Sequence, residues 1–553
     1  MSVERETFFG PGSPFEIAEE EVFGTTLPMF KHRKRSLREI LLATERFDDL
    51  EHLIYGDRRI TFREHRDVAT RFSHVLREEY GVQPGDRVAI LGANSPEWLQ
   101  AYWGATCAGA VVAALNGWWT GAEIEYGLDL VKPTLLVGDR RRLERIEGRI
   151  DVPTLEIESE FAPLVASPRY AGRPLAEIEQ GEDDPALILF TSGTTGFPKG
   201  AVLSHRCVIG FVQVPAAMRE LGLTEAGIDP ASVPKESILV SAPMFHVSGV
   251  MAIGVLAMSD GAKCVLRQGA FDPEDVLRLI EQERVTSWAA LGSAGPRVAR
   301  HPKLASYDRS SVTRVSFGGG PTSPAIKAQL ADAFPNTENR MGMSYGLSEG
   351  SAVGAVIGGV EYEAHPDAVG RPSPTVQIEI RDGRGRVLAD GEKGEIFLRS
   401  PYVMVEYWDN PEATAETIGE GRWLATGDVG HFEEGLLYIH SRERDLILRS
   451  AENIYPAEIE NRLEAHEKVR EAAVVGVDHP EHGQEVKAIV VVDPAAPPDE
   501  LALEKWSREV LAGFKVPTLW ELRHEPLPRN ASGKVLKSVL RGEAEPVDDR
   551  DGA

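Results

Sequence analysis

The chain has 553 residues, too many for a single hydrophobic core, so we expect a large body of packed subdomains and at least one separable domain. Its composition, 42% hydrophobic and 26% charged, is that of a soluble globular protein without low-complexity segments. A formal net charge of −26 argues against broad binding to nucleic acids or anionic membranes, because the summed field repels such partners.

The three cysteines, Cys107, Cys207 and Cys264, show no paired spacing, which favours core positions in a reducing compartment over disulfides or a zinc site. The first ten residues lack a basic stretch followed by an apolar run. The most apolar stretch, residues 101–115, is too short and broken to span a bilayer. These features predict a cytoplasmic protein without a transmembrane segment.

Apolar runs alternate with helical patterns through the first two-thirds of the chain. A strand at 86–91 precedes a helix that starts after Ser95, with Pro96 in its first turn, and a second strand follows at 110–115. Further strands are expected at 134–137, 186–190, 237–240 and 312–317, each followed by a polar or glycine-rich turn. This alternation is typical of an α/β fold, which binds ligands at such turns.

Two kinds of conspicuous residues receive structural interpretations. Trp118 and Trp119 are adjacent, and such tryptophans are more often half-buried packing residues than a binding surface. The charge runs 31–35 and 140–142 are most simply solvated surface, with a carrier or a phosphate as the alternative partner.

From residue 376 to 399 short strands are separated by turns at Asp382-Gly383 and Asp390-Gly391, which indicates a β-rich subdomain. A last unit begins near Arg444. It combines a helix opening at Pro456, strands at 472–477 and 487–492, and a helix after Pro498, as in a small α+β domain.

The run Thr191–Gly200, TSGTTGFPKG, follows an apolar strand and contains four hydroxyls, three glycines and one lysine. Glycines let backbone N–H groups approach phosphate oxygens, hydroxyls add hydrogen bonds, and Lys199 supplies a positive charge. The run is not a Walker loop, because Pro198 precedes the lysine and Gly200 follows it. Taken alone, the run fits a phosphate cradle and an ordinary serine- and glycine-rich surface loop equally well.

Seven further motifs follow this run in a fixed order: PMFH at 243–246, GGGP at 318–321, SYGLSE at 344–349, TGD at 426–428, RERD at 442–445, ENIYP at 452–456 and PRNASGK at 528–534. With them, residues 38–541 resemble the adenylate-forming superfamily of acyl-CoA synthetases, luciferases and peptide-synthetase adenylation domains. The resemblance implies a large N-terminal domain of α/β subdomains plus a β-rich subdomain, residues 1–443. A small mobile α+β C-terminal domain, residues 444–553, would complete it.

The resemblance also implies the chemistry: ATP and a carboxylic acid, fatty or aryl, form an acyl-adenylate with release of pyrophosphate. Tyr345 would stack on adenine, Asp428 and Arg442 would grip the ribose, and Glu349 would hold Mg²⁺. Ser348 replaces the more usual threonine and keeps the hydroxyl. The implied catalytic residues are Lys534, Glu349 and Thr195. The implied ATP-binding residues are Thr191, Ser192, Gly193, Thr194, Thr195, Lys199, Gly318, Gly319, Gly320, Tyr345, Gly346, Ser348, Asp428, Arg442 and Lys534.

Lys534 is assigned an electrostatic role in this scheme: its ammonium stabilises charge that shifts as the carboxylate attacks the α-phosphorus. Without the surrounding motif it would be interpreted as a solvated lysine in a tail. His246 is interpreted as an aromatic gate of the acid pocket, not a general base, since a lone histidine near an apolar run is more often structural. The implied pocket residues are His246, Val247, Gly292 and Gly320.

The sequence is compatible with more than one acceptor of the activated group. Coenzyme A is the expected co-substrate, delivered after rotation about a hinge at Arg444, where the family usually has aspartate or lysine. Ser450 and Ala451 replace glycines that many CoA ligases place before Glu452, and their side chains narrow the expected acceptor tunnel.

Three alternatives therefore stay open beside CoA transfer: transfer to an amine, ATP-dependent nitrite activation that diazotises an aryl amine, and a non-catalytic nucleotide-binding protein. The last would be favoured by loss of Lys534, Glu349 or Asp428, and all three are present. The expected partners are a small-molecule acid, ATP, and CoA or another small nucleophile, with no nucleic acid. The identity of the acid and the oligomeric state stay open, with a homodimer among the options.

Overall fold

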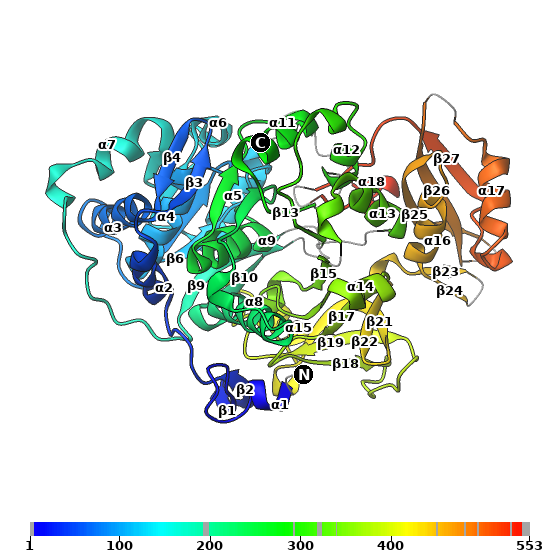
Figure 1. The fold of residues 1–553 in the computed structure, drawn as a ribbon, viewed down its shortest axis with the longest axis horizontal. Helices are drawn as coiled ribbons and strands as arrows, with labels where there is room; N and C mark the ends of the chain where they lie inside the picture. The colour runs from blue at the N-terminus through cyan, green and yellow to red at the C-terminus, as the bar shows by residue number, and fades with distance from the viewer. Residues whose placement is uncertain are drawn as a thin grey trace.

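The computed structural model describes residues 5–191, 198–290, 294–317, 323–338, 340–449, 452–480, 483–494, 497–530 and 533–544. They form a large unit up to about the end of β22 and a small unit beyond it (Figure 1). The small unit, orange to red, lies at one end of the long axis, and α3 and α7 lie at the other. The mixed α/β fold agrees with the fold class expected from the sequence.

A first sheet of the large unit has seven strands. The five consecutive strands from β9 to the β8 edge, in the order β9, β6, β5, β7 and β8, run parallel. In sheet order the strands are β20 (Glu406–Tyr407), β10 (Lys199–Ser204), β9 (Pro185–Thr191), β6 (Val111–Ala114), β5 (Arg87–Leu91), β7 (Leu135–Gly138) and β8 (Thr154–Glu156).

A second, thirteen-stranded sheet changes character along its length. Its strands β12, β11, β13, β14 and β15 pair in parallel. From β15 to the β18 edge of the sheet, every neighbouring pair is antiparallel, which confirms and extends the expected β-rich region. In sheet order the strands are β18 (Gln377–Arg381), β19 (Gly394–Arg399), β21 (Leu424–Glu433), β22 (Leu436–Arg442), β17 (Ala368–Pro372), β16 (Ala355–Gly358), β15 (Met341–Tyr345), β14 (Arg314–Phe317), β13 (Ser287–Ala289), β11 (Ser237–Val240), β12 (Lys263–Leu266), β3 (Glu51–Tyr55) and β4 (Arg58–Thr61).

Helices of the large unit start where the sequence signals them. The Ser95 hydroxyl accepts the N–H of Trp98, Pro96 is the first helical residue, and the helix that follows is buried almost all round. The helices are α1 (Arg5–Phe8), α2 (Leu37–Ala43), α3 (Phe62–Glu78), α4 (Pro96–Cys107), α5 (Gly121–Val131), α6 (Arg140–Leu143), α7 (Ala162–Val165), α8 (His205–Glu225), α9 (Val247–Gly249), α10 (Ala257–Asp260), α11 (Pro273–Glu283), α12 (Ala294–Ala299), α13 (Pro324–Ala333), α14 (Gly359–Ala364) and α15 (Pro411–Thr417).

The small unit buries two hydrophobic clusters of its own, whose members all lie between Ile447 and Leu540. Long strands β25 and β26 pair antiparallel at its centre, and β27 adds in parallel. Its elements are β23 (Ile447–Arg449), β24 (Glu452–Ile454), α16 (Pro456–Glu464), β25 (Val469–His479), β26 (Gly483–Val492), α17 (Glu500–Arg508), β27 (Leu519–Arg523) and α18 (Lys537–Leu540). This is the α+β unit that the sequence predicts near Arg444.

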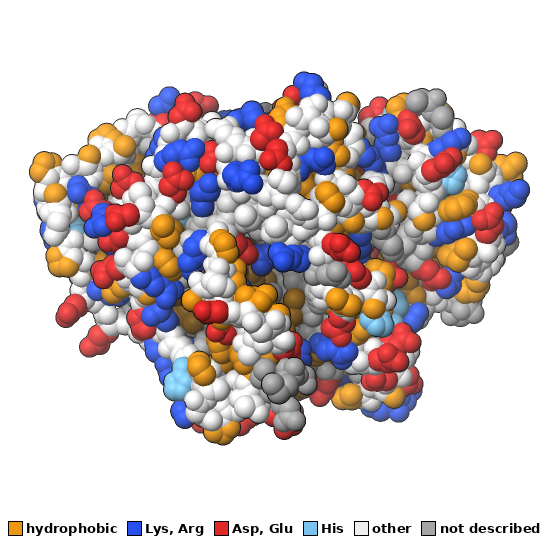
Figure 2. Space-filling model, in the orientation of Figure 1, with side chains coloured by type: hydrophobic (Ala, Val, Ile, Leu, Met, Phe, Trp, Pro, Cys, Tyr) orange, Lys and Arg blue, Asp and Glu red, His pale blue; other side chains and the backbone are white. Residues whose placement is uncertain are grey.

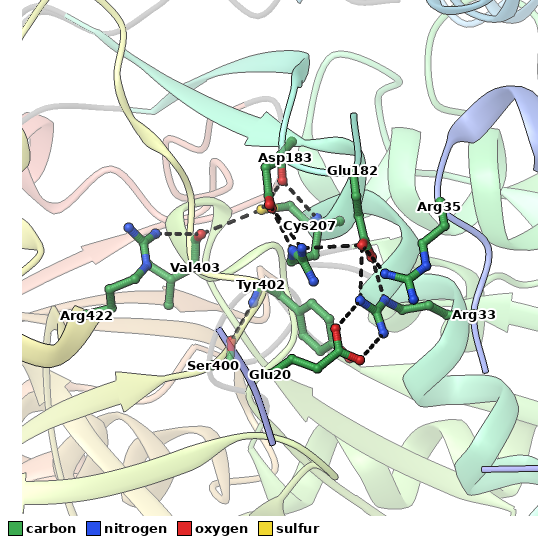
Figure 3. A network of polar contacts seen from close by, with 12 residues as sticks. Glu20, Arg33, Arg35, Glu182, Asp183, Cys207, Ser400, Tyr402, Val403 and Arg422 are labelled. Atoms are coloured by element: carbon green, nitrogen blue, oxygen red, sulfur yellow. Dashed lines mark hydrogen bonds and ion pairs between the residues drawn. The ribbon is translucent and has the colours of Figure 1, made fainter. Parts of the chain in front are cut away.

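A buried ion network joins the N-terminal segment to the root of the β9–β10 hairpin (Figure 3). The N-terminal hairpin, β1 (Ile17–Val22) and β2 (Thr25–Phe30), leads into Arg33, whose side chain is fully buried. Its guanidinium bonds to the carboxylates of Glu20 and Glu182 at 2.5–3.0 Å. Glu182 lies just before β9 and also contacts Arg206 of α8.

The interpretation of residues 31–35 and 140–142 as solvated surface holds for Lys31, His32, Arg35 and Arg140, whose side chains are more than half exposed, and is wrong for Arg33 and Arg142. Arg33 is buried against carboxylates far away in the sequence. Arg142 is 3% exposed because it bonds to Asp139 and to the carbonyl of Gly117. A buried arginine is tolerated when each N–H finds an acceptor, and both arginines have them here.

Other structural interpretations are confirmed. Cys107, Cys207 and Cys264 are buried thiols. Trp119 is 7% exposed and packs edge-on against Phe190, 5.0 Å between ring centroids. Lysine, arginine, aspartate and glutamate side chains are interspersed over the face drawn in Figure 2. None of the helices described is both long and apolar enough to cross a membrane.

Candidate functional site

Thr191 and Lys199 lie opposite each other at the end of the β9–β10 pair where the chain passes from one strand to the other. Thr191 is the last residue of β9 and Lys199 the first of β10, so both border the glycine-rich run. Ser192, Gly193, Thr194 and Thr195 fall outside the described residues. The ammonium of Lys199 lies 4.8 Å from the centre of the Tyr407 ring, a cation–π contact.

Glu349 stands in a short turn that follows β15. Gly346 opens this turn, and a Cβ there would meet the backbone of Ala352 at 2.5 Å, so only glycine fits. The turn itself, Ser348–Gly350, is a single 3₁₀ turn that ends at Ser351, whose φ is +55°. The Glu349 carbonyl accepts the N–H of Met404 at 2.7 Å. Its carboxylate accepts the Tyr407 hydroxyl at 2.8 Å.

Asp428 joins Tyr345 and Arg442 into one polar group. The Tyr345 hydroxyl donates to the Asp428 carboxylate at 2.8 Å. Arg442 is the direct register partner of Asp428 across β21 and β22, and its Nε lies 3.4 Å from that carboxylate. Burial and the Asp428 carboxylate raise the pKa of Tyr345 well above its usual value, so its hydroxyl stays a donor. The antiparallel pairing thus brings the TGD and RERD motifs together.

Lys534 comes from the small unit and reaches the same group. The Asn530 N–H donates to the Lys534 carbonyl at 2.9 Å, and the Lys534 N–H donates to the side-chain amide oxygen of Asn530 at 2.9 Å. Gly533, just before the lysine, has φ +82°. Burial and the nearby Arg442 lower the pKa of Lys534 to about 8, while the Asp428 and Glu349 carboxylates act in the opposite direction. The charges of two carboxylates of the large unit therefore act on a lysine of the small unit.

His246 borders the same region from the other side. It caps α9, and its Nδ1 accepts the N–H of Ser248 at 3.3 Å. Burial and the Lys534 ammonium lower the pKa of His246 to about 4, so the ring is neutral at physiological pH. A neutral, buried imidazole whose Nδ1 is an acceptor suits a pocket wall better than proton abstraction. Val247 beside it is buried, and Gly292 lies outside the described residues.

The acceptor segment is a hairpin of the small unit. β23 and β24 pair antiparallel, with Arg449 opposite Glu452 across the hairpin end. Arg449 bonds to the Glu485 carboxylate at 3.0 Å and to the Phe514 carbonyl at 2.8 Å. Ser450 and Ala451 fall outside the described residues.

Arg444 lies in the 3₁₀ turn between the units, next to Asp445. Burial, followed by the charge of Arg442, lowers its pKa. Asp445 makes a 3.1 Å ion pair with Arg541, which follows α18.

The structure thus gathers Lys199, Glu349, Asp428, Arg442 and Lys534 around Tyr345 and Tyr407, with His246 nearby. Gly318, Gly319 and Gly320 fall outside the described residues.

Two contributing residues are not predicted from the sequence. Tyr407 sits in a strand of two residues, and its contact with Glu349 spans 58 positions. The side-chain amide of Asn94 makes two hydrogen bonds to the loop before His246. It donates to the Ala242 carbonyl and accepts the Met244 N–H, each at 2.8 Å. The signal available for Asn94 is its place directly after a parallel strand.

The residues present fit a magnesium ion bound together with ATP. Mg²⁺ is usually held by one or two carboxylates with phosphate oxygens and water, not by an all-protein cage. Glu349 offers such a carboxylate, and the bond from Tyr407 engages only one of its two oxygens. Within the described ranges no three His, Cys, Asp or Glu side chains cluster as a cage would require.

Comparison with known proteins gives the following matches. The family model "AMP-binding enzyme" matches residues 42–408, and "AMP-binding enzyme C-terminal domain" matches residues 458–534. A feruloyl-CoA synthase of an Amycolatopsis species is 32% identical, covering 88% of this chain and 94% of that protein. A long-chain-fatty-acid–CoA ligase of Bacillus subtilis (strain 168) is 30% identical, covering 92% and 94%. Among solved structures, the amide bond synthetase McbA from Marinactinospora thermotolerans is 29% identical, with a TM-score of 0.80 over 92% of this chain and 99% of that one.

Proposed function

The chain belongs to the AMP-binding enzymes, and from this premise we propose that it is an acid:CoA ligase that activates a fatty or aryl carboxylic acid with ATP. In the first half-reaction a carboxylate oxygen of the acid attacks the α-phosphorus, a P–O bond forms, and pyrophosphate leaves. In the second the thiol of CoA attacks the acyl carbon, AMP leaves, and the thiol proton is released.

The observation that carries this proposal is the position of Lys534. Its ammonium interacts electrostatically with the carboxylates of Asp428 and Glu349 and with His246 at the proposed acid pocket. A cation between the acid and the nucleotide suits the step in which negative charge moves from the carboxylate toward pyrophosphate. The lowered pKa of about 8 still leaves most of the lysine charged at neutral pH.

The remaining nucleotide contacts are proposed from the same geometry. The Tyr345 ring would stack on adenine with Gly318, Gly319, Gly320 and Gly346 along its edge. Asp428, fixed by Tyr345 and Arg442, would accept the ribose hydroxyls. The other proposed phosphate-side residues are Thr191, Ser192, Gly193, Thr194, Thr195, Lys199 and Ser348. Mg²⁺, bound with ATP and held by Glu349, would neutralise charge on the leaving pyrophosphate.

We also propose a functional division into residues 1–443 and 444–553 with a hinge at Arg444. Its support is that the small unit buries its own hydrophobic clusters. Lys534 would serve the first half-reaction in the present arrangement, and a rotation about Arg444 would replace it in the site by the segment Ser450, Ala451 and Glu452.

CoA as acceptor is supported by the feruloyl-CoA synthase and fatty-acid–CoA ligase relatives. Transfer to an amine is the second candidate, favoured by the similarity to the amide bond synthetase McbA and by Ser450 and Ala451 in place of glycines. The two candidates share the first half-reaction and differ only in the nucleophile.

The test has two stages. ATP–pyrophosphate exchange is measured with ferulate, palmitate and a panel of related acids, and we expect exchange that depends on one class of acid. AMP release with that acid is then followed with CoA or with a simple amine added. A rise with CoA is the expected result. A rise with the amine and no response to CoA would assign the amide-forming function, and no exchange with any acid would contradict adenylation.

A further inference from the structure

Tyr407 lies between the two charged groups that flank the proposed phosphate position. Its hydroxyl donates to the Glu349 carboxylate at 2.8 Å, and its ring faces the Lys199 ammonium at 4.8 Å. Tyr407 is 5% exposed, whereas Lys199 and Glu349 are both partly exposed. One side chain therefore contacts a carboxylate and an ammonium at the same time.

The two contacts use opposite electrostatic properties of tyrosine. The phenol hydroxyl is a donor that suits a carboxylate, whereas the face of the ring carries partial negative charge that suits a cation. Phenylalanine keeps the ring face and loses the donor; leucine loses both. Burial and the Glu349 carboxylate raise the pKa of Tyr407, so the hydroxyl keeps its proton throughout the working pH range.

The backbone around Tyr407 is tied to both sides of the site. It pairs with Ala201 of β10, and the Trp408 N–H donates to the Gly200 carbonyl at 2.8 Å. The Tyr407 N–H donates to the Thr414 hydroxyl at 2.9 Å. Three residues earlier, Met404 bonds to the Glu349 carbonyl. The same short segment thus holds the strand that starts with Lys199 and the turn that carries Glu349.

The segment is in turn anchored by the network of Figure 3. The Arg422 guanidinium donates to the carbonyls of Val403 and Met404, and the Cys207 thiol lies 3.6 Å from the Val403 carbonyl. The position of Tyr407 is therefore determined by contacts on several sides.

We propose that Tyr407 is a positioning residue of the nucleotide site, which aims Glu349 and Lys199 at the phosphates of ATP and prevents them from pairing with each other. Opposite charges at a partly buried site attract each other more strongly than in bulk water, and a direct Lys199–Glu349 pair would remove both from the nucleotide. This inference rests on the proposed function, because it assigns Tyr407 to the binding of Mg²⁺ and ATP.

The experiment is calorimetric titration of the full chain with ATP, once with MgCl₂ and once with EDTA. The variants are Tyr407→Phe and Tyr407→Leu. The matched control is Tyr402→Phe. Tyr402 lies in the same segment as Tyr407, and this variant removes a buried hydroxyl that accepts a hydrogen bond from Thr375. For the wild type we expect tighter binding with Mg²⁺.

For Tyr407→Phe we expect an unchanged affinity for ATP in EDTA. The increase in affinity that Mg²⁺ brings should be about tenfold smaller than in the wild type, because the variant lacks one charge-assisted hydrogen bond. Tyr407→Leu should also bind ATP more weakly in EDTA, because Lys199 loses its contact with the aromatic ring. In a Glu349→Gln background Tyr407→Phe should have no further effect. If Tyr407→Leu does not fold, Tyr407→Phe alone decides.

A Tyr407→Phe variant that keeps the full gain from Mg²⁺, like Tyr402→Phe, would overturn this inference and leave the proposed function standing. A wild-type protein that binds no ATP under either condition would overturn both.

Discussion

The nucleotide side and the acceptor side of the site are built differently. On the nucleotide side, Glu349, Asp428 and Lys534 come from three distant stretches, and two of them are held by tyrosine hydroxyls. On the acceptor side, the β23–β24 hairpin is anchored by Arg449 to Glu485 and Phe514, all within the small unit. Leu448 in this hairpin is 53% exposed. In the proposed reaction, the first half-reaction would therefore need residues of both units, whereas the proposed acceptor segment is held by contacts within the small unit.

The largest expected effect comes from a substitution that impairs only the nucleotide side of the site. Lys534→Ala should lower ATP–pyrophosphate exchange by at least about 10²–10³-fold, since a preplaced charge at the reacting group is lost. The melting temperature should stay near that of the wild type, because the lysine contributes charge and not packing. Lys505→Ala, on an exposed position of α17, is the control. Near-normal exchange in Lys534→Ala would refute the assigned role.

A pH profile of the exchange reaction sharpens the same comparison. The pKa of Lys534 is lowered to about 8, so its ammonium is present below that pH and lost above it. Exchange should fall about tenfold per pH unit above 8. Arg442→Met removes a cation that lowers this pKa, so the fall should begin at higher pH. A fall above pH 8 that persists in Lys534→Arg would contradict this assignment, because arginine keeps its charge.

The smallest effect concerns the acceptor side. Replacing Ser450 and Ala451 with glycine should raise CoA-thioester formation by about threefold, or about 0.7 kcal/mol, by widening the passage. Exchange should not change, because the hairpin takes no part in the first half-reaction. Ala465→Gly, at an exposed site after α16, controls for backbone flexibility in the small unit. Reduced exchange in the double variant would show that the two sides are not separable.

Local signals predict most of the elements and few of the contacts. The strand at 86–91, the Ser95 cap and the helix at Pro456 depend on neighbouring residues, and the structure contains each of them. The sequence places Arg33 at the surface, because its partner Glu182 lies 149 positions away and no local pattern predicts the ion pair. The contact from Tyr407 to Glu349 is missed for the same reason. Motif order predicts which residues gather, and the register of β21 and β22 explains why Asp428 meets Arg442.

The arginine network of Figure 3 gives the N-terminal segment a role as counter-ion. Glu182 is 8% exposed, and three guanidinium groups surround it, two of which come from Arg33 and Arg35. Without these two, Glu182 and Asp183 would share Arg206 alone, and a net negative charge would be left at the base of the β9–β10 hairpin. The strands on either side of the proposed phosphate-binding run therefore start from a base whose charge is balanced by residues more than 140 positions earlier in the chain.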